Sequence, residues 1–243
     1  MSIVEHKIFD IKVQTMSELE LREILNTFLS SASQHQIVTV NPEFILAAKS
    51  NDLFRRIINN ASLSTIDGTG LIHALKFMGD KASMDERVTG NKIIRKLIDL
   101  AIATDSKILF CLYSEGLTKA EQLKNALEKK YPKLQFEISD EKNSVIVANM
   151  TEPQIIMATM GAPKQDLWLY ENLTNMPSVR IAVGVGGAVD FLSGAIRRAP
   201  KIMRTMGLEW FWRLYLQPRR FKRIYRSIFV FYFNVIKYKY AKK

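Results

Sequence analysis

The chain has 243 residues, of which 47% are hydrophobic and 24% charged, a balance typical of a globular protein with a sizeable core. The single cysteine, Cys111, excludes an internal disulfide and fits a reducing compartment. The sequence begins without a basic, apolar leader and has no run of about 18 apolar residues, so we expect neither a signal peptide nor a transmembrane helix.

Positive charge is concentrated near the C-terminal end, although the formal net charge of the whole chain is +11. Residues 197–243 contain 14 of the 35 Lys and Arg residues but one acid, Glu209, which gives this segment a charge of +13. Residues 1–196 have 21 basic and 23 acidic residues, a net charge of −2. Such asymmetry indicates a partner such as nucleic acid or an anionic membrane surface.

Strand and helix patterns alternate along the chain, with period-two and helical spacing of the apolar residues. In chain order they predict strand Ile8–Val13, helix Met16–Ser31 with Leu19 on its apolar side, strand Gln36–Val40, helices Pro42–Lys49 and Leu53–Asn59, strand Leu63–Ile66, helices Leu71–Met78 and Lys92–Ala103, strand Lys107–Leu112, helix Leu117–Lys130, strand Gln135–Ile138, helix Lys142–Asn149, strand Gln154–Met160, helix Pro163–Leu173 and strand Val179–Val183. This alternation predicts an α/β fold with a doubly wound, largely parallel sheet of Rossmann-like type.

The α/β catalytic domain is expected to cover residues 1–195, and a C-terminal appendage residues 196–243. The appendage pattern predicts two helices, Pro200–Leu216 and Arg219–Tyr240, separated by Pro218. Its second helix is amphipathic and rich in aromatic residues between arginines, a composition that favours a membrane surface over a solvated basic face.

Candidate site residues lie where predicted strands end, because ligands of such sheets bind outside the carboxyl ends of the strands. Asp67 follows one strand and can act either as a general base or as a cap of the next helix. Thr39 and Asn41 end another strand, where they can hydrogen-bond a sugar or phosphate; Asn41 can equally cap the helix that starts at Pro42.

Two further polar residues have a functional and a structural interpretation. Arg87 can pair bidentately with a diphosphate, or form a surface ion pair with Glu86 or Asp85. Gln165, on the first turn of a helix, can contact a sugar or base, or belong to a solvated helix start.

The glycine turn after the last strand contains Gly184, Gly186 and Gly187, which permit positive φ and close approach of a ligand. It lacks the third glycine of a dinucleotide fingerprint and follows the last strand instead of the first, which argues against a nicotinamide oxidoreductase. Asp190 can bind a ribose but is better explained as a helix cap.

No metal site is evident, because the three histidines are scattered and no DxD pair occurs. We therefore expect no cofactor and no metal, and arginines in place of the divalent ion that neutralises a diphosphate leaving group in many sugar-nucleotide transferases. Arg213, Arg220 and Arg223 have the spacing of one helical face and are candidates for taking over that charge.

Several sequence blocks in this order resemble the WecG/TagA/CpsF family of bacterial glycosyltransferases, glycosyltransferase family 26. They are TVNPEFILAA, IDGTGLIHA, ERVTG, MGAPKQDLW, GVGGAVDFLSGAIRRAP and GLEWFWRLYLQPRR. The resemblance extends over roughly residues 37–225, and several blocks in order are far more specific than any one alone.

This resemblance implies an inverting, metal-independent transfer of a sugar, with Asp67 as the base. The implied donor is a UDP-sugar, above all UDP-N-acetylmannosamine, with UDP-N-acetylmannosaminuronate or UDP-glucose as alternatives. The implied acceptor is a polyprenyl-diphosphate-linked N-acetylglucosamine in the synthesis of teichoic acid or another surface polysaccharide. The residues expected to bind substrate are Thr39, Asn41, Gly68, Thr69, Arg87, Gln165, Gly186 and Asp190.

We accordingly expect a peripheral protein on the cytoplasmic face of a bacterial membrane, which can self-associate in solution through the apolar surface beneath the appendage. The rival hypothesis, a nucleic-acid-binding protein that uses the basic tail, is disfavoured by the near-neutral body. The sequence departs from the family pattern in two loops, residues 113–116 and 139–144, which bears on the identity of the donor.

Overall fold

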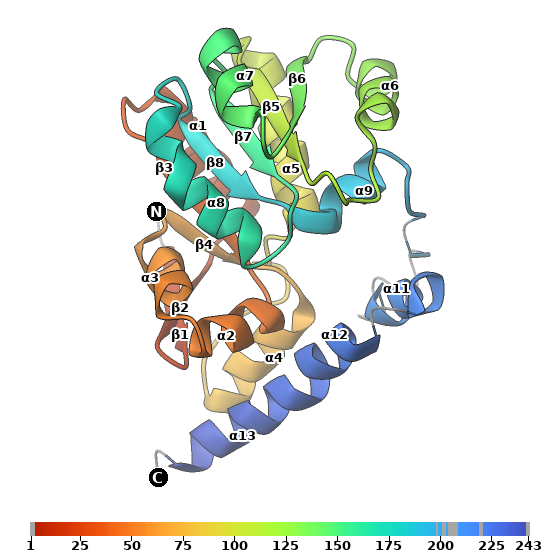
Figure 1. Ribbon diagram of the computed structural model, residues 1–243. Helices are drawn as coiled ribbons and strands as arrows, with labels where there is room; N and C mark the ends of the chain where they lie inside the picture. Colours follow the sequence, from red (N-terminus) through yellow and green to blue (C-terminus); the bar gives the residue numbers. More distant parts are fainter. Residues whose placement is uncertain (1–2, 198, 201–202, 204–208, 219–220, 242–243) are drawn as a thin grey trace.

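An eight-stranded sheet forms the centre of the computed structural model (Figure 1), which describes residues 3–197, 199–200, 203, 209–218 and 221–241. Its strands are β1 Val4–Ile8, β2 Ile11–Thr15, β3 His35–Val40, β4 Leu63–Ile66, β5 Lys107–Leu112, β6 Gln135–Asp140, β7 Ile155–Ala158 and β8 Ile181–Gly184. They lie in the order β1-β2-β4-β3-β8-β7-β5-β6, and each neighbouring pair is parallel except β1 with β2. The predicted α/β class with a largely parallel sheet is confirmed.

Helices cover both faces of the sheet. One face is covered by α1 Glu18–Ser30, α5 Gly90–Thr104 and α6 Ala120–Lys130. The other is covered by α2 Pro42–Lys49, α3 Asp52–Asn60, α4 Thr69–Met78, α7 Ser144–Thr151 and α8 Lys164–Asn172. After β8 come the short α9 Val189–Leu192, then α11 Glu209–Leu216, α12 Phe221–Tyr225, a π-helical turn at Arg226–Val230 and α13 Phe231–Ala241.

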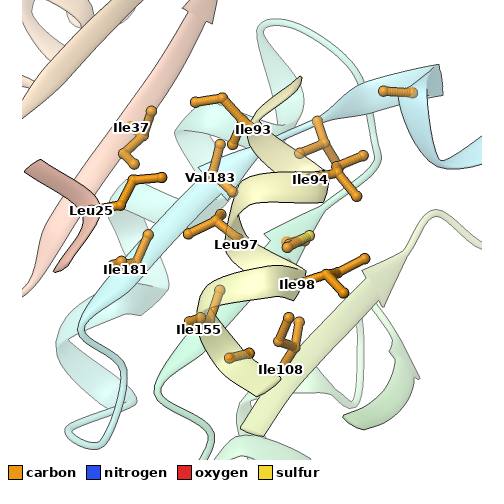
Figure 2. Packing of buried hydrophobic residues seen from close by; sticks show 14 of the residues in the cluster. Leu25, Ile37, Ile93, Ile94, Leu97, Ile98, Ile108, Ile155, Ile181 and Val183 are labelled. Carbon is orange, nitrogen blue, oxygen red and sulfur yellow. The ribbon is translucent and has the colours of Figure 1, made fainter. Parts of the chain in front are cut away.

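The strands supply the core by alternation, since successive side chains point to opposite faces. Ile37 packs with α1 and α5 on the first face, and its neighbour Val38 packs with α2 and α3 on the second. Figure 2 shows the first face, where Leu97 of α5 lies among isoleucines of β3, β7 and β8 and Val183 of β8. Each fully buried side chain of this size stabilises the fold by about 1.5–3 kcal/mol.

The N-terminal strand prediction was wrong in one respect: Ile8–Val13 is not one strand but the turn region of a hairpin. Phe9 and Asp10 take positive φ values of 51° and 63°, which are the values that a two-residue turn of type I′ requires. Alternation alone cannot reveal such a turn, because Phe9 is an unusual residue in it. The next helix also differs from its prediction, since Leu19 is 67% exposed and does not join the buried side of α1.

The C-terminal helix lies against the body, over α2 and α4 (Figure 1). Phe231 and Val235 are fully buried in the same cluster as the residues of those two helices. The Phe9 ring packs edge-on against Phe231 and Tyr238, with centroids 6.4 and 4.9 Å apart. The apolar residues of this segment therefore divide into a buried set and a second set that faces outward.

The outward set forms a stripe at nearly constant four-residue spacing. Its members are Phe221, Tyr225, Phe229, Phe233, Ile236 and Tyr240, each between 47% and 68% exposed. The rings of Phe221, Tyr225 and Phe229 stack one on the next. Among the residues described, no helix is both long and apolar enough to cross a membrane. The predicted helices of residues 200–216 and 219–240 fall partly outside the described residues.

Candidate active site

The candidate site lies at the carboxyl ends of β4, β3 and β8, which are neighbours in the sheet. β3 continues into α2 on one face, whereas β8 continues into residues 185–189, which pack with α5 on the other face. In parallel sheets, ligands bind where neighbouring strands diverge in this way. The strand ends are tied together: Thr39 Oγ1 donates to the Gly184 carbonyl at 3.1 Å, and the Asp67 N–H donates to the Val40 carbonyl at 2.7 Å.

Asp67 is half-buried in the turn that follows β4. Gly68, not Asp67, occupies the N-cap position of α4, with φ +101° and ψ 151°, a conformation essentially restricted to glycine. The Asp67 Oδ2 atom accepts from the Gly90 N–H, the first residue of α5, at 3.4 Å. The positive end of that helix dipole favours the ionised carboxylate, which is the form a general base needs.

The helix α4 begins at Thr69, two residues after Asp67, with Gly68 at its N-cap position. Gly68 gives this helix no side-chain cap, so none of the first-turn N–H groups beginning at Thr69 is satisfied by a side chain at the N-cap position. The first N–H groups of a helix, together with its dipole, suit a phosphate or carboxylate. Gly68 and Thr69 thus stand where a diphosphate can approach the backbone.

Asn41 and Thr39 both have structural bonds. Asn41 caps α2, because its Oδ1 accepts from the N–H groups of Glu43 and Phe44 at 2.9 and 3.3 Å. The capping alternative is therefore realised, and the Nδ2 group is what remains to donate to a ligand. Thr39 is 4% exposed and donates its hydroxyl to Gly184.

The segment that contains Arg87 runs beside Asp67. It is fixed to β4, because Thr65 Oγ1 donates to the Val88 carbonyl and the Val88 N–H donates to the Ile66 carbonyl, both at 3.1 Å. Glu86 does not pair with Arg87: its Oε2 accepts from the Ser83 N–H at 2.9 Å. Within the described part of the chain Arg87 has no ion pair, so the alternative interpretation, a surface pair with Glu86 or Asp85, is not observed.

Gln165 is buried, with 2% exposure, and is not part of a solvated helix start. Its Oε1 accepts from the N–H groups of Gly161 and Gly186, at 3.0 and 2.9 Å. The two glycines have positive φ values of 76° and 47° and belong to the segments after β7 and β8. Gln165 therefore ties two loops of the site together, and its carbonyl oxygen is already used.

Asp166, which the sequence analysis passed over, is fully buried on the first turn of α8. Neither carboxyl oxygen accepts a hydrogen bond of standard geometry. Burial raises the pKa of this carboxyl to about 7, opposed by the Gln165 amide and by the backbone N–H of Asp166. A buried acid with so shifted a pKa beside a site residue is a marker of functional positions.

Asp190 lies farther along, in α9. It does not cap that helix, since the N-cap position is occupied by Ala188. Its buried carboxylate accepts from Thr118 Oγ1 at 2.7 Å, and the same hydroxyl lies 2.9 Å from Ser193 Oγ. Asp190 thus joins α9 to the segment before α6, and the capping interpretation was wrong.

Of the three appendage arginines, one has a side chain within the described structure. The backbone of Arg213 lies in α11, but its side chain, like the whole of Arg220, falls outside the described residues. Arg223 pairs with Glu43, with 2.5 Å between Nε and Oε2. Because Glu43 follows Asn41 by two positions, the structure brings this arginine to the same end of α2 as the candidate site.

The arrangement combines a carboxylate with a helix N-terminus. Within the described ranges no three His, Cys, Asp or Glu side chains gather as a metal site would require. Asp67 can accept a proton from a hydroxyl, and the α4 N-terminus can receive an anion close to it. Such a pair of functions suits the displacement of an anionic leaving group by an alcohol.

Comparison with known proteins gives a consistent result. The chain matches the family described as Glycosyl transferase WecG/TagA/CpsF family over residues 6–243. It is similar to N-acetylglucosaminyldiphosphoundecaprenol N-acetyl-beta-D-mannosaminyltransferase of Staphylococcus aureus strains NCTC 8325 / PS 47, COL and MSSA476. In each case the identity is 29% over 229 residues, which is 91% of this chain and 88% of the relative.

Proposed function

Because the chain belongs to the WecG/TagA/CpsF family of glycosyltransferases, we propose that it transfers N-acetylmannosamine from a UDP-sugar to a polyprenyl-diphosphate-linked N-acetylglucosamine. The product would be a precursor of teichoic acid or a related surface polysaccharide. The relatives' name supports the sugar and the acceptor. UDP-N-acetylmannosaminuronate and UDP-glucose are the alternative donors.

One observation carries the proposal: the half-buried Asp67 carboxylate lies between two helix N-termini at the carboxyl edge of the sheet. Its Oδ2 contacts the start of α5, and the next residue, Gly68, opens the uncapped α4. A base and an anion-binding element so close together suit a sugar nucleotide whose diphosphate leaves as a hydroxyl attacks.

The proposed reaction is a single displacement. Asp67 takes the proton of the acceptor hydroxyl as that oxygen attacks the anomeric carbon of the donor. The bond between that carbon and the diphosphate oxygen breaks on the opposite side, and UDP departs with the bonding electrons. With an α-linked donor, this displacement inverts the configuration and yields the β linkage that the relatives' name contains.

The leaving diphosphate needs positive groups. The α4 N-terminus around Gly68 and Thr69, together with Arg87, would meet the charge of UDP. Asn41 Nδ2 and the glycine backbone at Gly186 would contact the sugar. Arg213, Arg220 and Arg223 would hold the diphosphate of the lipid acceptor, with Arg223 exchanging its Glu43 partner for phosphate oxygens. No divalent ion is required in this scheme.

The exposed aromatic stripe from Phe221 to Tyr240 would lie on an anionic membrane surface. Rings at that spacing insert into the headgroup region, and each basic residue nearby adds on the order of 1 kcal/mol of attraction. The protein would then act from the cytoplasmic face, where it meets its lipid-linked acceptor. Without lipid, the same stripe would promote self-association.

The direct test is a screen of UDP-sugars with a short-chain lipid-diphosphate N-acetylglucosamine acceptor, with the product's anomeric configuration determined by NMR. We expect transfer from UDP-N-acetylmannosamine with inversion. Asp67→Asn should abolish most turnover, whereas Asp85→Asn, an exposed aspartate of the neighbouring loop, should not. Failure of every donor, or a retained anomeric configuration, would overturn the proposal.

A further inference from the structure

The buried carboxyl of Asp166 occupies an unusual place in the fold. It is 0% exposed and its two oxygens have no hydrogen-bond partner of standard geometry. A buried charge or polar group is normally paired, because desolvation without a partner is unfavourable. A carboxyl that persists there calls for a role other than packing, since an apolar side chain would fill the same space more favourably.

The carboxyl lies beside the amide of Gln165, and both lie against Gly184 of β8. A Cβ atom at Gly184 would lie 2.2 Å from Gln165 Nε2 and 2.8 Å from Asp166 Oδ1. Both distances are far below van der Waals contact, so only glycine at this position admits the two polar groups. The space left by one missing side chain is thus filled by an amide and a carboxyl.

The orientation of the Gln165 amide follows from its bonds. Oε1 accepts from the N–H groups of Gly161 and Gly186, so the NH₂ group must point the other way, toward Asp166. An amide rotated by 180° would have nearly the same shape but would place its NH₂ group against two backbone donors. The two backbone donors already disfavour the rotated amide, and a carboxyl on the NH₂ side disfavours it further.

We propose that Asp166 is a positioning residue of the active site: its carboxyl strengthens the orientation that the Gly161 and Gly186 N–H groups give the Gln165 amide, and this amide holds together the loops that follow β7 and β8. Gln165 Nε2 and Asp166 Oδ1 meet beside Gly184, 2.2 and 2.8 Å from the point where its Cβ would lie. The two loops contain Gly161 and Gly186, and the second of them begins directly after Gly184, whose carbonyl accepts from the Thr39 hydroxyl.

The test exchanges the two chemical groups between the neighbouring positions. Gln165→Glu keeps the acceptor for the two glycine N–H groups but sets two carboxyls side by side. Adding Asp166→Asn restores one donor and one acceptor, because the new amide can donate to the new carboxylate. Asp166→Ala removes the acceptor, and Asp166→Asn alone keeps a weaker one.

Two properties of each variant are measured at pH 8.5: amide hydrogen exchange and turnover. Glu171→Gln, at the exposed far end of α8, is the control. Amide hydrogen exchange of Gly161 and Gly186, read by NMR, needs no substrate. It should quicken by about 10-fold or more in Gln165→Glu and in Asp166→Ala, less in Asp166→Asn, and return toward the wild-type rate in the double variant.

Turnover with the UDP-sugar should follow the same order, with kcat affected more than KM, and only this second measurement depends on the proposed function. If the wild type transfers no sugar, the proposed function fails. The exchange data would still show whether Asp166 positions the Gln165 amide. Should Gln165→Glu not fold, the contrast between Asp166→Ala and Asp166→Asn decides. Strictly additive effects in the double variant would overturn the proposal. Equal exchange rates in Asp166→Ala and Asp166→Asn would overturn it as well.

Discussion

Replacing Asp166 by Asn should change how the stability of the protein depends on pH. The fold holds this carboxyl fully buried with a pKa of about 7, against an ordinary value of 3.8. One pKa unit corresponds to about 1.4 kcal/mol, so the difference amounts to about 4 kcal/mol between the protonated and ionised limits. Asn has nearly the same shape and does not ionise, so it removes this contribution without creating a cavity.

The direction in which the free energy of unfolding changes with pH follows from proton binding. Between pH 3.8 and about 7 the folded state retains a proton on Asp166 that the unfolded state has lost. The free energy of unfolding of the wild type therefore falls, through this group, as pH rises across that window, by at most about 1.4 kcal/mol per pH unit. Below pH 3.8 the contribution is constant, and above about 7 the loss is complete.

The assay is urea unfolding of wild type and Asp166→Asn at several pH values from 5 to 8.5. Subtracting the two curves cancels the other titrating groups, which are common to both proteins. We expect the stability of the variant relative to the wild type to increase by about 3 kcal/mol over this range. Glu171→Gln should show no such trend. A difference that stays within about 0.5 kcal/mol at all pH values would refute the assigned pKa and its cause.

Three further predictions concern the proposed reaction and its location. Asp67→Asn should lower turnover by roughly 10²-fold or more with an unchanged free energy of unfolding, as expected for loss of a general base; near-normal turnover would exclude this role. Activity should persist in excess chelator, and its complete loss with recovery on adding magnesium would contradict the metal-independent scheme. Replacing Phe229 and Phe233 by Ser should weaken binding to anionic vesicles at high salt with little effect on stability, since both rings are more than 60% exposed; unaltered co-sedimentation would argue against membrane contact by the stripe.

Much of the fold could be predicted from the sequence, because parallel strands buried on both faces have strong local patterns. Leu63–Ile66 and Lys107–Leu112 were predicted with the observed bounds. Since ligand sites of such sheets form at the carboxyl ends of strands, Asp67 and Thr39 could also be placed at one edge. The hairpin at Phe9 could not be predicted, because its turn needs positive φ at Phe9 and Asp10, and Phe is not a typical turn residue.

The sequence could not show which hydrogen bonds each polar side chain makes, or whether that side chain is buried. Whether Asn41 caps a helix or binds a ligand depends on how α2 leaves β3, and the structure shows the cap. Asp166 has the position of a solvated acid on a first helical turn. Its burial arises only because α8 packs over Gly184, eighteen positions away along the chain. Such burial is a property of tertiary packing, and no local pattern contains it.

The C-terminal helix α13 connects the proposed membrane surface to the helices α2 and α4, which begin at the candidate site. Its buried side holds Phe231 among residues of α2 and α4, and the Tyr232 hydroxyl donates to the Gly70 carbonyl in the first turn of α4 at 3.4 Å. Its outward side carries the stripe. Removing everything after Ala195 would take away both sides at once and leave apolar residues of α2 and α4 exposed to water. Loss of activity in such a truncated protein would therefore not separate membrane contact from damage to the helices that begin at Pro42 and Thr69. Substitutions confined to the stripe leave that packing intact, so they are the changes that distinguish an anchor from a part of the active site.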